Sequence, residues 1–199
     1  MEQRAVAPHD DLDARQLVEQ IGVLLARRGH TLAVGETSAG GALASLIHVV
    51  PLSESWFRGG IVLYAGRDVP LAQSIRGVAS FHGVVSEEYV AALAGLVQRT
   101  FACEWALAES GIAGPQIGRR SAKPVGMVCL AVAGPKPSRN FTQARGTSLR
   151  ATADMLVGEE PVWATTRVLV DSGRNANQRQ FAVEALRLCL HVLEAYVGE

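Results

Sequence analysis

Residues 32–47 read LAVGETSAGGALASLI, and this stretch decides the fold class. It starts as a short apolar run, passes through Gly40-Gly41, and continues as an alanine- and leucine-rich run that stops before Pro51. The order predicts a buried strand, a tight turn and a helix, which is the recurring unit of α/β proteins. Thr37 and Ser38 lie at the bend, and two interpretations stay open: a hydroxyl caps the helix, or a hydroxyl reacts within a site.

The rest of the chain also alternates between predicted helices and strands. Apolar residues recur every three to four positions from Leu12 to about Gly29, which predicts a helix, and Ser86 followed by two glutamates is typical of a helix start. The run at 125–134 is apolar almost throughout, so we expect a central strand covered on both faces. Further strands are predicted at 59–65, 104–110 and 165–170, and further helices at 149–156 and 176–197.

Length and composition favour one α/β domain and argue against several classes of function. The chain has 199 residues, of which 48% are hydrophobic, and this is enough for a substantial core. Nineteen basic and nineteen acidic side chains balance, which argues against direct nucleic-acid binding. We expect residues 1–11 to form a flexible tail and residues 12–199 to form a single domain, with 134–168 as an extended insertion.

Cysteine, histidine and hydropathy patterns narrow the function further. The three cysteines are widely spaced in apolar surroundings, which suits reduced core thiols. The five histidines lack metal-ligand spacing, so we predict no metal and no other cofactor. The N-terminus is unlike a signal peptide and no apolar run reaches membrane-spanning length, so we expect no membrane association and a cytoplasmic location.

Three polar loops lie where α/β proteins bind ligands, at the ends of strands and the starts of helices. The first is the bend at 35–41, and the second carries Ser110 and Gly111 in a turn of small residues. The third, 171–179, places Arg174 at the front of the last helix, where it and the helix amides suit an anion. Each loop taken alone also suits a purely structural role. Their glycine spacing differs from that of a phosphate loop or a dinucleotide fingerprint.

Six stretches form a distinctive set when they are read in order. They are GETSAGGALASLI, SESWFRGGIVLY, HGVVSEE, SGIAGP, KPVGMV and SGRNANQ. Over residues 12–195, this set resembles the C-terminal domain of the competence- and damage-inducible CinA family. The resemblance implies a three-layer α/β/α sandwich with a mixed central sheet, assembled as a homo-oligomer. It also implies hydrolysis of the carboxamide of nicotinamide mononucleotide to nicotinic acid mononucleotide and ammonia, without a metal or cofactor.

The resemblance also assigns roles to individual residues. The family's nucleophilic serine corresponds to Thr37, its strand tyrosine to Tyr64, and its phosphate-binding arginine to Arg174. The candidate catalytic residues are Thr37, Ser38, Tyr64 and Ser110, and the candidate substrate-binding residues are Glu36, Gly40, Gly41, Gly111 and Arg174.

Two positions depart from the family pattern. The lysine that activates the nucleophile corresponds to Val69, and the second arginine of the last loop corresponds to Gln178. A hydroxyl nucleophile needs a group to take its proton, and such assistance contributes roughly 10²–10⁴-fold in rate. Asp68 or Glu36 as the base, and Ser38 as the nucleophile, stay open as alternatives. Two hypotheses follow: an amidohydrolase with an altered site, or a catalytically silent relative that binds a small molecule or serves in assembly.

Overall fold

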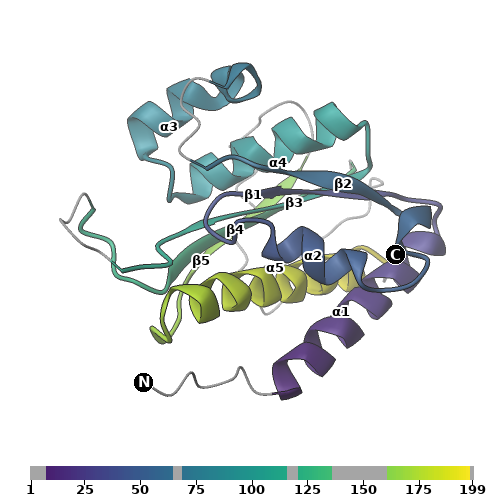
Figure 1. Cartoon of the computed structure of the whole chain (residues 1–199). Helices are drawn as coiled ribbons and strands as arrows, with labels where there is room; N and C mark the ends of the chain where they lie inside the picture. Colours follow the sequence, from purple (N-terminus) through teal and green to yellow (C-terminus); the bar gives the residue numbers. More distant parts are fainter. Residues whose placement is uncertain (1–7, 65–68, 116–120, 136–160, 198–199) are drawn as a thin grey trace.

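A computed structural model describes residues 8–64, 69–115, 121–135 and 161–197 (Figure 1). The strands are β1 (Leu32–Glu36), β2 (Phe57–Val62), β3 (Trp105–Gly111), β4 (Met127–Ala133) and β5 (Val162–Val168). They form one sheet in the order β2-β1-β3-β4-β5. β1 is parallel to β2 and β3, whereas β4 is antiparallel to β3 and β5, so the sheet is mixed.

Helices cover both faces of the sheet (Figure 1). The helices of one face are α1 (Pro8–Ala26), α2 (Ala42–His48) and α5 (Arg174–Val197). The other face is covered by α4 (Glu87–Phe101), on which α3 (Arg76–His82) packs. Two short 3-10 helices, η1 (Ser53–Ser55) and η2 (Pro70–Ile75), lie in the connections. The expected three-layer α/β/α sandwich with a mixed central sheet is therefore confirmed.

Small residues on one face of the sheet let α4 pack closely against it. A Cβ atom on Gly35 would lie 2.8 Å from Val97 Cγ2 and 3.0 Å from Leu93 Cγ, closer than the separation at which carbon atoms pack. The other sheet residues in this buried cluster are mostly alanines, namely Ala33, Ala106, Ala108, Ala131, Ala133 and Ala164. The near absence of large side chains on this face is what brings the helix close to the backbone of the central strands.

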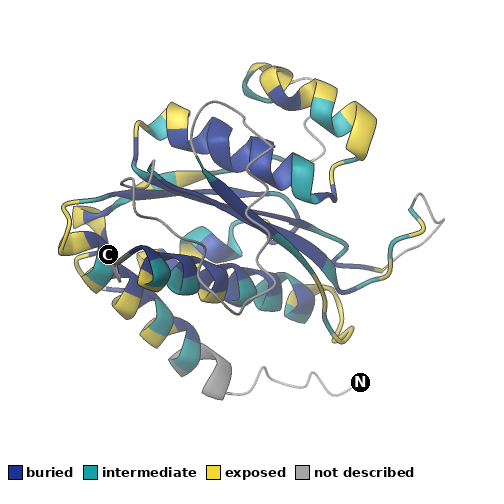
Figure 2. Ribbon diagram, turned by 180° about the vertical axis from the view of Figure 1, so that it is seen from behind, coloured by how far each residue is buried: buried dark blue, intermediate teal, exposed yellow. Residues whose placement is uncertain are grey.

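Large side chains fill the opposite face, under α1, α2 and α5. The indole of Trp105 is fully buried, stacks on Trp163 with 6.2 Å between ring centroids, and meets Tyr196 edge-on at 5.0 Å. Its Nε1 donates a hydrogen bond to His30 Nδ1 at 3.1 Å, so the polar edge of the ring is satisfied. Figure 2 shows the sheet buried between the two helical layers.

The start of α4 follows the sequence prediction. Ser86 is the N-cap residue, and its hydroxyl oxygen accepts a hydrogen bond from the backbone N–H of Tyr89 at 3.1 Å. Glu87 and Glu88 lie in the first turn, where negative charge is stabilised by the helix dipole. Local sequence signals therefore determine where this helix begins.

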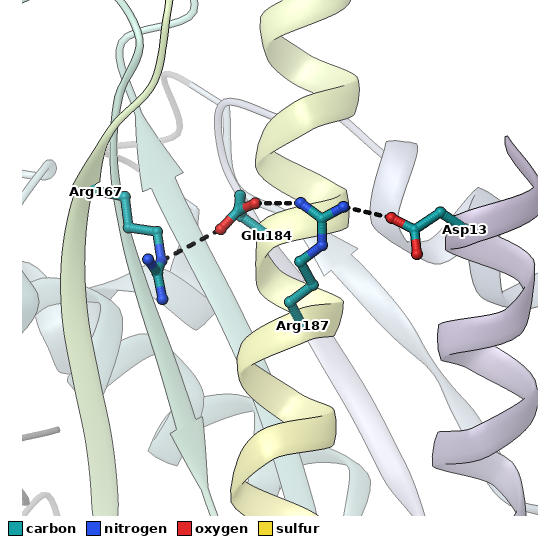
Figure 3. Close-up of polar contacts among 4 residues, drawn as sticks. All are labelled: Asp13, Arg167, Glu184 and Arg187. Carbon is teal, nitrogen blue, oxygen red and sulfur yellow. Dashed lines mark hydrogen bonds and ion pairs between the residues drawn. The ribbon is translucent and has the colours of Figure 1, made fainter. Parts of the chain in front are cut away.

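A chain of ion pairs ties α5 to its neighbours (Figure 3). Glu184 on α5 lies 3.3 Å from Arg167 Nε on β5 and 2.6 Å from Arg187 Nη1. Arg187 also pairs with Asp13 on α1. Glu184 is 15% exposed and the other three residues of the chain are about half exposed, so we expect each pair to contribute no more than about 1 kcal/mol.

Most predicted elements are present, with shifted ends. The first helix begins at Pro8, inside the expected tail: proline is favoured in the first turn of a helix, and Asp10 and Asp11 follow it where negative charge is stabilised. The strand expected at 165–170 is β5, which begins and ends earlier. No helix is predicted at the position of α3, a seven-residue helix that contacts the core only through the partly buried Val78 and Ala79. The helix expected at 149–156 and most of the 134–168 insertion lie outside the described residues.

The cysteines have the environment that the sequence predicts. Cys103, Cys129 and Cys189 are free and buried. Burial raises the pKa of the Cys103 thiol to about 11 and that of Cys189 to about 12, so both remain protonated at neutral pH. Within the described part of the chain, no helix is both long enough and apolar enough to span a membrane.

Candidate functional site

The three polar loops identified in the sequence meet at the carboxyl ends of β1 and β3. Thr37, directly after β1, donates a hydrogen bond from Oγ1 to Ser110 Oγ on β3 at 2.8 Å. Arg174, at the start of α5, donates from Nη1 to the carbonyl of Gly114 at 2.6 Å. Residues from early, middle and late parts of the sequence thus contribute to one site. This is the edge of a parallel strand pair at which α/β proteins bind ligands.

The carboxylate of Glu36 caps helix α2. It accepts hydrogen bonds from the backbone N–H groups of Gly41 (2.8 Å), Leu43 (3.0 Å) and Ala44 (2.9 Å). The N-cap residue is Gly41, whose φ of 100° is costly for residues with a side chain. Neither hydroxyl of the bend caps the helix, so the cap interpretation of Thr37 and Ser38 is wrong.

The position of Glu36 limits where a ligand anion can bind. The three N–H groups that it occupies are those that a helix N-terminus offers to a phosphate. Glu36 is fully buried, and although burial raises the pKa of its carboxyl, the three backbone hydrogen bonds oppose this effect. A phosphate group therefore needs donors from elsewhere in the site.

A second buried carboxylate, Glu109 on β3, holds the bend. One oxygen accepts hydrogen bonds from the backbone N–H groups of Thr37 (2.6 Å) and Ala39 (2.8 Å), and the other accepts from Ser38 Oγ (2.6 Å). Glu109 has no exposed surface. Neither the motifs nor the family resemblance predicted a role for Glu109. The available signal was an acidic residue within a strand, WALAESG, that is otherwise apolar or small.

The pKa of the Glu109 carboxyl lies near neutral pH. Burial raises its pKa to about 7, while the hydrogen bonds from Ser38, Ala39 and Thr37 favour the ionised form. The charge of Glu36 raises the pKa further. Tyr89 on α4 faces the same carboxyl, and both burial and the Glu109 charge raise the pKa of its phenol. The side of the site formed by the bend is therefore acidic, since Glu36, Glu109 and Tyr89 supply no positive charge.

Thr37 is the more accessible hydroxyl of the bend. It is partly exposed, whereas Ser38 is buried at 8% exposure. Val69, at the position of the family's lysine, is 41% exposed and precedes η2. Lys123 is the lysine within the described residues, and its ammonium donates to a backbone carbonyl in the loop before α4. Within the described residues, the Thr37 hydroxyl donates its hydrogen bond to another hydroxyl, that of Ser110, and not to a basic group. Asp68, an alternative base, lies outside the described residues.

Arg174 and Tyr64 form a cationic side of the site. Both side chains are exposed, and Arg174 Nη2 lies 3.5 Å from the Tyr64 hydroxyl. Asn177, in the first turn of α5, donates to the carbonyl of Ala113 at 3.1 Å and so ties α5 to the loop that contains Gly114. A guanidinium has five N–H donors, and the two contacts leave others for bidentate binding of an anion.

The fold itself explains why glycine occupies the three candidate positions Gly40, Gly41 and Gly111. Gly40 and Gly41 have φ values of 67° and 100°, in the left-handed region that favours glycine. A Cβ atom on Gly111 would lie 2.6 Å from the carbonyl oxygen of Met127 and 2.8 Å from Phe181 Cε2. These three positions require glycine whether or not a ligand binds there.

The second altered position also has a structural contact. Gln178, where the family has an arginine, donates from its side-chain amide to the carbonyl of Ser38 at 2.9 Å. It therefore joins α5 to the bend without adding charge. Within the described residues, no group of three or more His, Cys, Asp or Glu side chains is arranged for a metal ion.

Two cavities are formed by residues outside this site. One, of about 290 Å³, lies between α5 and the segment after β5 and includes Leu169 and Val183. The other, of about 370 Å³, includes His48 and Phe57. None of the candidate catalytic or substrate-binding residues lines either cavity.

Sequence comparison relates the chain to CinA proteins. The family model described as the CinA C-terminal domain matches residues 14–152. A CinA-like protein from a Synechococcus strain is 44% identical over 115 residues, and one from Gloeobacter violaceus is 39% identical over 131 residues. These alignments cover 56% and 64% of this chain but 26% and 30% of the relatives, so the matched part is less than a third of their length.

Solved structures of CinA proteins share the fold. A CinA superfamily protein from Klebsiella pneumoniae has a TM-score of 0.70 at 20% identity, over 91% of this chain and 98% of its own. The competence/damage inducible protein CihA from Agrobacterium tumefaciens has a TM-score of 0.68 at 23% identity, over 98% and 99%. Since the family model also matches more than half of the sequence, this chain belongs to the CinA C-terminal domain family.

Proposed function

We propose that the chain binds nicotinamide mononucleotide or a related small nucleotide and hydrolyses its carboxamide to nicotinic acid mononucleotide and ammonia. The observation that carries this proposal is the meeting of the Thr37–Ser110 hydroxyl pair with Arg174 and Tyr64 at one edge of the sheet. Family membership supports the choice of ligand. The proposed reaction requires no metal and no cofactor.

The charge distribution favours one orientation of the mononucleotide. The phosphate pairs with Arg174, because Glu36 and Glu109 already occupy the backbone N–H groups of Gly41 and of the bend. The nicotinamide ring of the mononucleotide is a pyridinium cation, and it suits the acidic side of the site. In this orientation the carboxamide approaches Thr37.

The proposed chemistry uses Thr37 as the nucleophile. Its oxygen attacks the carboxamide carbon, the C–N bond breaks, and the threonine proton ends on the departing nitrogen as ammonia forms. Water then cleaves the threonyl ester, which releases the acid and restores the hydroxyl. Ser110 is placed to relay the proton, since Thr37 Oγ1 donates to it. Because a hydroxyl takes the place of a general base, we expect turnover to be slower by roughly 10²–10⁴-fold than in a site that contains such a base.

A second candidate function is nucleotide binding without turnover. It is favoured by Val69, an apolar side chain at the position of the family's activating lysine. A threonine hydroxyl is almost wholly undissociated at neutral pH, so loss of its proton acceptor removes much of its reactivity. The binding site would then serve a sensing or assembly role.

Further properties belong to the same proposal. We propose a single domain that includes the whole of α1 and carries an insertion at 134–168, a homo-oligomeric assembly and a cytoplasmic location, supported by family membership. Direct nucleic-acid binding is disfavoured by the balanced charge of the chain.

Ammonia release from nicotinamide mononucleotide tests the proposed hydrolysis. The unmodified chain is compared with Thr37→Ala and with Thr31→Ala as a matched control. Thr31 also flanks β1, but its hydroxyl donates to Glu104 at 2.8 Å at the opposite end of the strand. We expect ammonia from the unmodified chain and from Thr31→Ala, and none above background from Thr37→Ala.

Two further variants separate hydrolysis from binding alone. Val69→Lys and the double variant Thr37→Ser, Val69→Lys restore the family's residues. If the double variant releases ammonia and the unmodified chain binds the mononucleotide without turnover, the second candidate function is correct. If no variant turns over and calorimetry detects no binding, both candidate functions are wrong.

A further inference from the structure

The side chain of Glu109 continues the contact between β1 and β3 after their backbone pairing ends. The last residue pair between these strands is Gly35 with Ala108. Glu109 is the next residue of β3, and its carboxylate accepts hydrogen bonds from three consecutive residues of the bend, Thr37, Ser38 and Ala39. The carboxylate thus receives the N–H groups of the chain at the point where β1 turns into α2.

We propose that Glu109 is a positioning residue, whose carboxylate fixes the bend so that the Thr37 hydroxyl faces Ser110 and the bound nucleotide. The role in ligand binding rests on the proposed function, whereas the role in fixing the bend does not. Glu109 is fully buried, so it acts through the bend rather than by touching the ligand.

The hydrogen bonds of Glu109 depend on reach more than on charge. A glutamine at this position keeps a carbonyl oxygen for the Thr37 and Ala39 amides. Its NH₂ group donates a hydrogen bond to Ser38 Oγ. The serine hydroxyl accepts this bond once its own proton has rotated away. An aspartate keeps the charge but is one methylene shorter, so its oxygens withdraw from the bend. Buried N–H groups left without an acceptor are costly, and the bend is then free to move.

Glu104 provides a matched control at the other end of the same two strands. Its carboxylate accepts from the backbone N–H of Thr31 at 2.7 Å and from Thr31 Oγ1 at 2.8 Å. Thr31 immediately precedes β1, just as Thr37 follows it. Shortening Glu104 therefore removes a comparable contact between the same segments without disturbing the candidate site.

Two measurements on Glu109→Gln, Glu109→Asp and Glu104→Asp test the assignment. Amide hydrogen exchange of the ligand-free protein reports on the bend, and calorimetric titration with nicotinamide mononucleotide reports on binding. We expect Glu109→Asp to speed exchange at Thr37 and Ala39 and to weaken binding, each by about tenfold or more. Glu109→Gln should stay near the unmodified chain in both. Glu104→Asp should speed exchange at Thr31 and leave binding unchanged.

The outcomes separate this assignment from the proposed function. Unchanged exchange at Thr37 and Ala39 in Glu109→Asp would overturn it. So would a reversed pattern, in which Glu109→Asp binds normally and Glu109→Gln does not, because that pattern assigns the role to charge. If exchange responds as expected but the unmodified chain does not bind the mononucleotide, the proposed function fails and the positioning of the bend by Glu109 stands.

Discussion

Replacing Glu109 by glutamine is expected to change how the free energy of unfolding depends on pH. Burial raises the pKa of Glu109 from its ordinary 4.5 to about 7 in the folded protein. Between these two values the folded protein holds a proton that the unfolded chain has released. The resulting stability is fully present below pH 4.5 and is lost as the pH rises through 7.

The size of this effect follows from the two pKa values. One pKa unit corresponds to about 1.4 kcal/mol, so the difference between 4.5 and about 7 corresponds to about 3 kcal/mol. Glutamine does not titrate and retains the hydrogen bonds, so Glu109→Gln removes this pH dependence. Glu36 on β1 titrates in the same direction, since burial raises its pKa, but it is present in both proteins. Tyr89 on α4, whose pKa is raised above its ordinary 10, does not titrate in this range.

Urea unfolding at several pH values between about 5 and 8 measures the effect. The stability of Glu109→Gln relative to the unmodified chain should rise by about 3 kcal/mol across this range. Glu104→Gln is the control: although burial acts to raise the pKa of Glu104, the hydrogen bonds from Thr31 outweigh it and lower the pKa. Stability from a lowered pKa is lost only below pH 4.5, so this variant should differ from the unmodified chain by a constant amount. A constant difference for Glu109→Gln as well would refute the reasoning.

Three other variants test the packing, the helix cap and the cationic side of the site. Gly35→Ala places a Cβ atom 2.8 Å from Val97 Cγ2 and should cost about 1–3 kcal/mol in urea unfolding; an unchanged midpoint would contradict the close packing of α4. Ser86→Ala removes the acceptor of the N-cap and should cost about 1 kcal/mol, whereas no loss would show that the cap is dispensable. Arg174→Ala should weaken binding of the mononucleotide about tenfold or more in calorimetry, while Arg15→Ala, a surface control, should not; equal affinities would place the phosphate elsewhere.

The sequence predicted the layers of this fold because its periodic signals are local. The apolar run of β4, the bend at 35–41 and the serine cap of α4 each depend on a few neighbouring residues. The convergence of the three polar loops was also predictable, because strand ends and helix starts gather at one edge of an α/β sheet. Helix α3 was not predicted, because seven residues of which only Val78 and Ala79 are partly buried against the core give too short a periodic pattern.

The roles of the two buried carboxylates were not predictable from local signals. Glu36 was expected to contact substrate, but its carboxylate reaches past the bend to the amides of α2. Glu109 lies in a strand whose residues are buried on both faces, so alternation does not indicate which way its side chain points. Its partners lie about 70 positions earlier in the chain, and only the pairing of β1 with β3 brings them together.

Chemical-shift mapping tests most directly whether this edge of the sheet is the nucleotide site. The ¹⁵N-labelled chain is titrated with nicotinamide mononucleotide, and amide shifts are followed by NMR. We predict that the largest changes occur at Thr37, Ser110 and Arg174, with saturation as ligand is added. Changes grouped instead around the cavity that includes Leu169 and Val183, or no saturable change at millimolar ligand, would contradict the proposed site.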